Sequence, residues 1–273
     1  MACTASLIVP NLKLTQLEFF FKKNWRVLEA ELKTRQLQLI VVTSALETEE
    51  LDQWKNKYPS VGFIRIEKNY GFAMTVNVGF CLASGQWVGT VNDDVILTAG
   101  WWRSCLAAAN EKTGSLNPVI FNLEGQVESA GIKVLPKGKA EPMKKVLKLD
   151  RAVVDATNGA CVLYRQEALK TVGFFDRRFG SYLEDIDLSL RLTRAGWENV
   201  VCYQAKVTHL GHASSGTVQT WHKAWLDCKN WWWVILKNWS LATWLRHGPA
   251  ILLERGRNLS GLFKSLNPKR SAN

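Results

Sequence analysis

The sequence predicts an α/β fold in which helices cover both faces of a mostly parallel, Rossmann-like sheet. Short apolar runs typical of buried strands alternate with longer segments whose apolar residues recur every three or four positions. Apolar residues make up 47% of the 273-residue chain, which is enough to bury a substantial core. We predict an α/β domain over 1–220 and a C-terminal amphipathic helical segment over 221–273.

Strands and helices alternate through the first half of the chain. Thr15 and Glu18 have the spacing of a capping box, and apolar residues recur from there to Leu32 at helical spacing. The predicted strands are 6–10, 37–42, 61–66 and 87–91. The predicted helices are 15–32, 47–57, 73–83 and 98–109.

The second half is less regular at first and then regains clear elements. Gly and Lys dominate one stretch, which is typical of a loop, and helical spacing returns at Ile186. The predicted elements are a hairpin at 121–127, a mobile loop at 136–142, strands at 152–156 and 160–164, a helix from Ile186 that Gly196 ends, and a strand at 200–207.

Charge and cysteine content narrow the class of protein. The formal net charge of +11 indicates an anionic partner, which nucleic acid, a phosphorylated ligand or a membrane surface would satisfy. The six cysteines lack the paired spacing of zinc or redox centres. Near the N-terminus only 7–9 form an apolar run, and no basic leader precedes it. These features predict a reducing, cytoplasmic location.

Asn92-Asp93-Asp94 follows the predicted strand 87–91. Ligands of parallel sheets bind beyond the carboxyl ends of the strands, and Mg²⁺ or Mn²⁺ takes carboxylates together with phosphate oxygens. An exposed acidic turn without any ligand explains the same residues. His209 follows another strand and is either a structural histidine or a third metal ligand.

Glu184 and Asp185 stand at the start of the helix that Gly196 ends. Exposed N–H groups and the helix dipole stabilise carboxylates there, and a helix start can aim a carboxylate at a ligand. Simple capping by Asp185 is the alternative. Gly71 also has two interpretations. Backbone N–H groups at this glycine could approach a phosphate, or the glycine could simply form a tight turn.

Five motifs occur in a fixed order along the chain. They are Asn69-x-Gly71-Phe72-Ala73 with Asn77, Asn92-Asp93-Asp94-Val95, Asn158 to Arg165, Gly173-x-Phe175-Asp176 with Tyr182-x-Glu184-Asp185-x-Asp187, and His209. Taken in this order, they resemble the motifs of the family 2 glycosyltransferases with the GT-A fold. They are most similar to the rhamnosyltransferase-like branch that acts on lipid-linked bacterial glycans, and the similarity covers 6–214.

The resemblance implies a role for each matched residue. Asp94 would bind Mg²⁺ or Mn²⁺ on the donor diphosphate, and His209 would complete the metal site. Asp185 would be the catalytic base, with Glu184 beside it. The implied donor-binding residues are Pro10, Asn11, Thr43, Asn69, Gly71, Phe72, Ala73, Asn77, Asn92, Asp93, Gly159 and Ala160.

The implied reaction is an inverting transfer from a nucleoside-diphosphate sugar to a glycan or polyprenyl-linked acceptor, in cell-surface polysaccharide synthesis. A cation would neutralise the departing diphosphate. Asp185, ionised at neutral pH with a pKa near about 3.9, would accept the proton of the attacking hydroxyl. The family usually ends its second strand Val-Val-Asp-Asn-x-Ser. Here 41–45 read Val-Val-Thr-Ser-Ala, which leaves the donor base and full activity open.

The segment from Trp221 onward is rich in tryptophan and basic residues. From Lys223 onward, nine basic residues against two acidic ones give nine minus two, or +7, of the net charge of +11. No apolar run approaches the ~20 residues that span a bilayer. We predict peripheral binding to an anionic membrane at its inner face. Packing on the catalytic domain, with tryptophan as core, is the alternative. The recurring apolar positions are Trp225, Cys228, Trp232, Ile235 and Trp239.

Two other functions fit parts of the sequence. A sugar-nucleotide pyrophosphorylase uses a similar sheet but needs a Gly-rich basic loop after the first strand, which Pro10-Asn11-Leu12-Lys13 does not supply. A catalytically reduced protein on this fold would bind sugar nucleotide or nucleic acid without turnover or metal dependence. The acidic motifs 92–94 and 184–185 favour the enzyme, so no nucleic-acid partner is expected.

Overall fold

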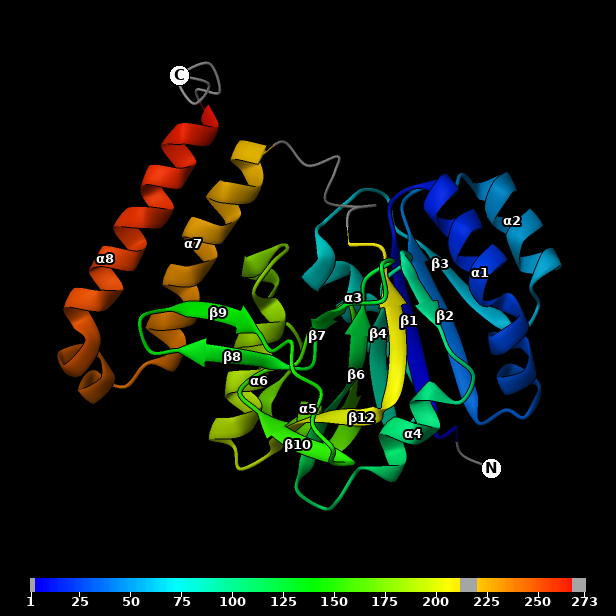
Figure 1. Cartoon of the computed structure of the whole chain (residues 1–273). Coiled ribbons are helices and arrows are strands. Elements are labelled where there is room, and N and C mark those ends of the chain that lie inside the picture. Colours follow the sequence, from blue (N-terminus) through cyan, green and yellow to red (C-terminus); the bar gives the residue numbers. More distant parts are fainter. Residues whose placement is uncertain (1–2, 212–219, 267–273) are drawn as a thin grey trace.

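The computed structural model of the protein describes residues 3–211 and 220–266 (Figure 1). The strands of its central sheet are β1 (Ala5–Asn11), β2 (Leu37–Thr43), β3 (Val61–Arg65), β4 (Trp87–Val91), β5 (Val95–Leu97), β6 (Thr113–Phe121), β7 (Val127–Ser129), β10 (Arg151–Val154), β11 (Cys161–Arg165) and β12 (Glu198–His209). The main path of the sheet runs β10-β12-β6-β11-β4-β1-β2-β3, with β5 paired to β12 and β7 paired to β6.

The sheet contains two parallel groups. One consists of β3, β2, β1 and β4, and the other of β6 and β12. The strand β11 joins them and is antiparallel to both β4 and β6. The prediction of a mostly parallel sheet is therefore confirmed, and the carboxyl ends of β1, β2 and β4 lie along one edge.

Helices cover both faces of the sheet, because successive strand residues point to opposite sides. Leu7 and Val9 of β1 pack into one core, whereas Ile8 packs into the other. Strands that are buried on both faces read as continuous apolar runs, which is the pattern of the sequence. The first face carries α1 (Leu14–Lys33), α2 (Thr48–Lys57) and α4 (Trp101–Ala107), and the second carries α3 (Phe72–Leu82), α5 (Gln166–Val172) and α6 (Glu184–Arg194).

The predicted capping box of Thr15 and Glu18 is wrong. The helix α1 begins one residue earlier, and its N-cap makes no side-chain hydrogen bond within the described residues. Thr15 already lies in the first turn, whereas a capping side chain belongs to the residue that precedes the helix. A capping box occurs instead at the start of α2, between Glu47 and Glu50.

The segment 136–142, predicted as a mobile loop, forms most of a hairpin. Here β9 (Lys139–Pro142) pairs antiparallel with β8 (Ile132–Leu135). Gly138 adopts the left-handed φ of +76° at the turn, and a Cβ added to it would lie 2.6 Å from the Ile235 side chain. Arg255 donates a hydrogen bond to the carbonyl of Gly138. C-terminal helices therefore hold this hairpin, and the sequence of 136–142 alone does not predict its contact with them.

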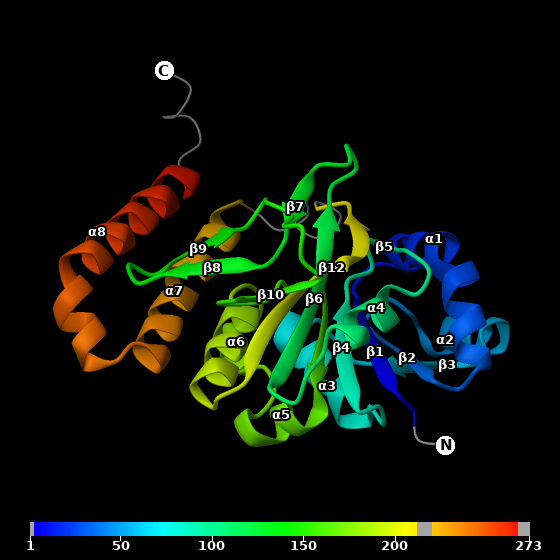
Figure 2. The same ribbon diagram turned by 60° about the horizontal axis from the view of Figure 1, so that its bottom comes forward.

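Two helices form the described part of the C-terminal segment, α7 (Thr220–Asn238) and α8 (Leu241–Leu266). They lie side by side, and the β8–β9 hairpin crosses α7 with its turn towards α8 (Figures 1 and 2). Trp231 and Ile235 of α7 share a core cluster with Phe179 and with Ile186 of α6. The tryptophan-rich face of α7 is thus partly core, as the alternative interpretation held, although Trp225 is exposed.

The division of the chain at 220 and 221 stays a prediction, since α7 and α6 contribute to a single apolar cluster. Residues 212–214, at the end of the motif similarity, lie outside the described residues. In the described part of the chain, no helix combines the length and the apolar character needed to cross a bilayer.

Candidate active site

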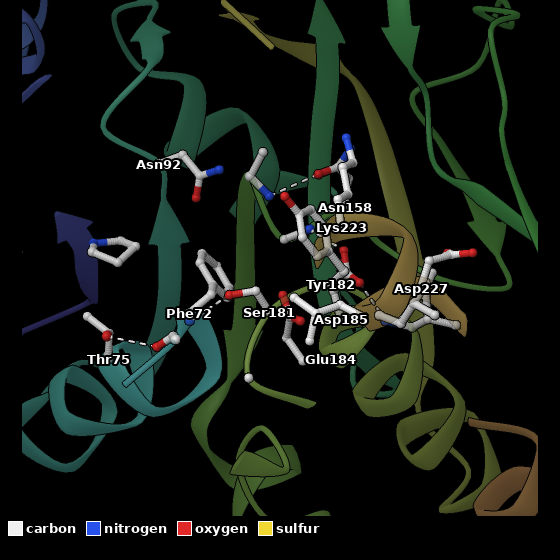
Figure 3. Close-up of a pocket in the computed structure, with 18 of the residues that line it drawn as sticks. Phe72, Thr75, Asn92, Asn158, Ser181, Tyr182, Glu184, Asp185, Lys223 and Asp227 are labelled. Carbon is white, nitrogen blue, oxygen red and sulfur yellow. Dashed lines mark hydrogen bonds between the residues drawn. The ribbon is translucent and has the colours of Figure 1, made fainter. Parts of the chain in front are cut away.

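A cleft of about 1120 Å³ opens at the carboxyl ends of β1 and β4 and is also lined by the starts of α3, α6 and α7 (Figure 3). This is the edge at which parallel sheets bind their ligands. Asp93 and Asp185, far apart in the sequence, both line it. The predicted site residues in its walls are Pro10, Asn69, Gly71, Phe72, Asn92, Asp93, Gly159, Ala160, Glu184, Asp185 and His209.

Asp94 and His209 lie together because β5 pairs antiparallel with β12, which sets Val95 opposite His209. His209 Nε2 lies 3.2 Å from Oδ1 of Asp94, and His209 Nδ1 lies 3.0 Å from Oε1 of Glu128 in β7. The Asp94 contact has the distance of an ion pair, yet this Oδ1 is buried and makes no hydrogen bond among the described residues.

These side chains fit a divalent cation. A buried carboxylate oxygen without a hydrogen bond, next to an imidazole nitrogen, is the donor set that Mn²⁺ or Mg²⁺ would accept. Glu128 holds the other ring nitrogen of His209, as carboxylates do for histidine ligands. No set of three His, Cys, Asp or Glu side chains converges within the described residues, so diphosphate and water would have to complete the shell.

The same carboxylates control the protonation of His209. Burial lowers the pKa of the imidazole, but the adjoining Asp94 and Glu128 outweigh this effect and raise the pKa to about 9. A cation at Nε2 would therefore have to displace a proton at neutral pH.

A chain of hydrogen bonds between buried side chains holds Asp93 from the side that faces away from the cleft. Thr43 Oγ1 donates to Asn11 Oδ1 (2.8 Å), and Asn11 Nδ2 donates to Asp93 Oδ2 (2.8 Å). Burial raises the pKa of Asp93 to about 7, with the Asn11 hydrogen bond opposing the rise and the charge of Asp94 adding to it. Asn11 and Thr43 are fully buried, so only Asp93 of this chain reaches the cleft. Thr43, at the position of the missing carboxylate, orients Asn11.

Glu184 and Asp185 open α6, as predicted, but Asp185 is not its N-cap. Leu183 holds that position, and no side chain in the described part of the chain caps the helix. Asp185 accepts hydrogen bonds from the Gly159 N–H through Oδ2 and from the Ile186 N–H through Oδ1, each at 2.8 Å. Contact with Gly159 turns the carboxylate towards the end of β4 rather than along its own helix.

The two acids differ in protonation. Burial raises the pKa of Asp185, so the expectation of an ordinary pKa is wrong. Burial, with the charge of Asp185, raises the pKa of Glu184 well above its usual range. Two backbone N–H groups favour the ionised form of Asp185, whereas Oε2 of Glu184 is buried without a hydrogen-bond partner among the described residues. The ionised form is therefore favoured more at Asp185 than at Glu184.

The loop before α6 contacts the start of α3 through the backbone. Gly71 has φ +86°, and an added Cβ would lie 2.7 Å from the carbonyl oxygen of Gly180. The Ala73 N–H donates to this carbonyl (2.9 Å), and the Phe72 N–H donates to Ser181 Oγ (3.1 Å). Gly71 thus forms a tight turn and also lines the cleft.

Besides Asn11 and Thr43, two more residues expected to contact the donor lie outside the cleft. Ala73 is fully buried in the core beneath α3. Asn77 donates from Nδ2 to the Phe175 carbonyl (2.8 Å) and accepts from the Phe175 N–H (3.1 Å). Its side chain therefore holds a loop of the protein and is not available to a ligand.

The structure also adds residues to which the motifs assigned no role. Glu128 lies behind His209, and Tyr182, Lys223 and Asp227 line the cleft. The Lys223 ammonium lies 5.5 Å from the centre of the Tyr182 ring. These residues come from a short strand, a loop and the first turns of α7. The local signals were the motif that begins at Tyr182 and the basic character of the segment that contains Lys223.

Comparisons with known proteins place these features in a family. The chain is 28% identical to the N-acetylglucosaminyl-diphospho-decaprenol L-rhamnosyltransferase of Mycobacterium tuberculosis over 198 residues, which are 62% of this chain and 64% of that protein. It is 25% identical to the O-antigen biosynthesis protein RfbC of Myxococcus xanthus over 178 residues, 60% of this chain and 14% of that protein. The chain thus spans less than two thirds of either relative.

Solved structures share the fold at low sequence identity. GalNAc-T7 with UDP, GalNAc and Mn²⁺ superposes with a TM-score of 0.66 at 14% identity, over 86% of this chain and 48% of that one. The mannosyltransferase PcManGT of Pyrobaculum calidifontis, in complex with GDP-Man and Mn²⁺, gives 0.63 at 14% identity, over 100% and 76%. The predicted GT-A fold and rhamnosyltransferase-like resemblance are confirmed. Since the model of the glycosyltransferase-like family 2 matches residues 6–228, the chain belongs to that family.

Proposed function

We propose that this protein is an inverting glycosyltransferase that moves a sugar from a nucleoside-diphosphate sugar to an acceptor hydroxyl. The observation that carries the proposal is the shared cleft, which Asp185 lines together with Asp93 and His209, with Asp94 beside His209. The reaction needs a proton acceptor for the attacking hydroxyl and stabilisation of the departing diphosphate. The cleft holds groups suited to both tasks.

On the donor side, Asp94 and His209 would hold Mg²⁺ or Mn²⁺. When bound, the cation neutralises the charge that develops on the diphosphate. Asp93, held by Asn11, is placed for the ribose or the sugar, and Asn92 lies next to it. The other proposed donor contacts are Pro10, Asn69, Gly71, Phe72, Gly159 and Ala160.

On the acceptor side, Asp185 accepts the proton of the attacking hydroxyl. Burial raises its pKa, which makes the carboxylate a stronger proton acceptor than an exposed aspartate, while the N–H groups of Gly159 and Ile186 stabilise the ionised form. Glu184, with its strongly raised pKa, stays protonated and does not add a second charge. Attack from the side of Asp185, with the diphosphate leaving towards Asp94, inverts the anomeric centre.

The acceptor class comes from the relatives. The name of the M. tuberculosis relative gives an acceptor linked by a diphosphate to decaprenol, and the M. xanthus relative is named for O-antigen biosynthesis. By this likeness, the acceptor here is a polyprenyl-linked glycan, and the product serves cell-surface polysaccharide. Such an acceptor would place the enzyme at the inner face of the cell membrane.

The helix α8 supplies a surface for that location. We call its row of exposed apolar side chains the leucine stripe. The residues of the leucine stripe are Leu241, Leu245, Leu252, Leu259, Phe263 and Leu266. The exposed basic residues of the same helix are Arg246, Arg257 and Lys264. Apolar and basic side chains along one exposed helix suit the headgroup region of an anionic bilayer. The tryptophan face of α7, predicted for this role, is less suited because Trp231 is buried.

Thermal unfolding with UDP-, dTDP- and GDP-sugars, each with and without Mn²⁺, tests the proposal. A ligand at 100 times its Kd stabilises the folded state by about 2.7 kcal/mol. We expect one nucleotide class to raise Tm, to do so more strongly with Mn²⁺, and to be slowly hydrolysed. A Tm unchanged by every donor contradicts the proposal. Stabilisation without hydrolysis or transfer supports a catalytically reduced protein instead.

A further inference from the structure

A single side chain of α7 holds the loop that precedes the two acids. Asn230 is fully buried, and its Nδ2 lies 3.0, 2.8 and 2.7 Å from the carbonyl oxygens of Phe179, Ser181 and Tyr182. Asn230 is 51 residues from Phe179 along the chain. We call this set of hydrogen bonds the Asn230 clasp.

The chemistry of Asn230 suits this use. Carbonyl oxygens only accept hydrogen bonds, so the amide nitrogen, which carries two protons, must face the loop. The Oδ1 atom of Asn230 is buried and has no hydrogen-bond partner among the described residues. An unpaired buried acceptor is unfavourable. The hydrogen bonds that the amide nitrogen donates to the loop carbonyls therefore account for the burial of this side chain.

The clasped loop has an uncommon backbone. Tyr182 has φ +71° and Leu183 has φ +68°; of the other described non-glycine residues, only Arg35 has a positive φ. Adjacent L-residues in the left-handed region are strained and persist only where the surroundings impose that conformation. Glu184 and Asp185 follow directly (Figure 3). The direction in which Asp185 points thus depends on these two strained residues.

Further contacts from α7 hold both ends of the same segment. Lys229 Nζ donates to the Arg178 carbonyl at 3.1 Å, just before the clasp. Lys237 Nζ lies 2.8 Å from Oδ2 of Asp176 and 2.9 Å from Oδ2 of Asp187, which is two residues beyond Asp185. The helix α7 therefore contacts the segment 176–187 before, within and after its strained residues.

We infer that Asn230 is a positioning residue for sugar transfer, acting through Tyr182 and Leu183 to aim Asp185 into the cleft. The inference rests on the proposed role of Asp185 as the base. It gives α7 a task that differs from the membrane contact proposed for α8. It also explains why α7 begins as a wall of the cleft, at Lys223, and continues as a support for the loop.

Amide hydrogen exchange tests the clasp without any substrate. In Asn230→Ala, we expect the amides of 179–187 to exchange about tenfold faster than in the wild type, since local opening becomes easier. Val234→Ala is the matched control. Val234 is buried one turn later on α7, in the apolar cluster that also contains Phe179 and Ile186, so its truncation weakens the packing of α7 on this segment and leaves the hydrogen bonds to the loop carbonyls in place. Equal exchange of 179–187 in both variants overturns the inference.

Hydrolysis of the donor selected by the sugar-nucleotide screen tests the consequence. Small misplacement of a reacting group costs about 10- to 100-fold in rate, so Asn230→Ala should lower kcat by that factor while the donor KM stays nearly unchanged. Adding Leu183→Gly should restore part of kcat, because glycine adopts a left-handed backbone without strain. If Asn230→Ala does not fold, Asn230→Ser, which keeps one donor, replaces it.

The outcomes separate the two proposals. Faster exchange at 179–187 with a kcat equal to that of Val234→Ala overturns the positioning role of Asn230. A wild-type protein that hydrolyses no sugar nucleotide counts instead against the proposed function, whatever the exchange experiment shows.

Discussion

The two walls of the cleft are built in different ways. The donor wall is the carboxyl edge of the sheet, where Asn92 and Asp93 follow β4 and the pairing of β5 with β12 adds His209. The acceptor wall is a strained loop that a helix from the far end of the chain holds in place. Substitutions in the donor wall should therefore act mainly on donor and cation binding. Those in the acceptor wall should act on turnover.

The largest effect should come from Asp185→Asn in the acceptor wall. The change keeps the size of the side chain but removes the proton acceptor, and positioned bases contribute about 10²–10⁴-fold. We expect kcat for transfer to fall by that factor, with donor affinity nearly unchanged. Asp94→Asn is the contrasting variant and should weaken Mn²⁺ binding. Near-normal turnover of folded Asp185→Asn would falsify the assignment of the base.

The donor wall was also the part that the sequence could predict. The strand 87–91 has the predicted bounds, and its end places Asn92 and Asp93 in the cleft. Parallel strands fix such positions, because their carboxyl ends share one edge. The role of Glu128 could not be predicted, because its contact with His209 depends on how a three-residue strand folds back on β6.

The acceptor wall was predictable only in part. Glu184 and Asp185 could be predicted from their motif and from their position at the start of a helix. The left-handed backbone of Tyr182 and Leu183 does not, since no glycine marks it and tertiary contacts impose it. The role of Asn230 could not be predicted either, because an asparagine within an amphipathic pattern is usually expected on the polar side of the helix. Local patterns cannot show which loop carbonyls a distant helix will meet.

A second prediction concerns cation binding by the donor wall. Without a cation, the raised pKa of His209, about 9, keeps the imidazole protonated between pH 6 and pH 8. A cation must displace this proton, so affinity for Mn²⁺ should rise about tenfold per pH unit, or about 100-fold over this range. Titration followed by Mn²⁺ electron paramagnetic resonance measures it. In His209→Gln the affinity should be weaker and its pH dependence much flatter; an unchanged slope contradicts the assigned ligand.

A third prediction concerns the contact between the walls, at Gly71. Alanine there would carry a left-handed φ and place its Cβ 2.7 Å from the Gly180 carbonyl oxygen. Gly125 has a similar φ, +74°, with no described atom near enough to meet a Cβ, so Gly125→Ala measures the conformational cost alone, about 1 kcal/mol. Gly71→Ala should lower the free energy of unfolding by about 1–3 kcal/mol more. Equal losses in urea titrations would show that the two walls do not depend on this contact.

The smallest effect should lie outside both walls, on the basic side chains beside the leucine stripe. Each lysine near an anionic bilayer adds about 1 kcal/mol of binding free energy, so Lys264→Gln should weaken binding to phosphatidylserine-containing vesicles about fivefold at moderate salt. Lys33→Gln on α1 removes the same charge from a side chain that is 74% exposed at the other end of the molecule, and it should leave binding unchanged (Figure 1). Sedimentation measures the binding of both variants.

Equal losses in the two variants would mean that net charge, rather than the surface of α8, attracts the protein to lipid. No binding of the wild type would remove the membrane from the proposal, while the predictions for the two walls would stand.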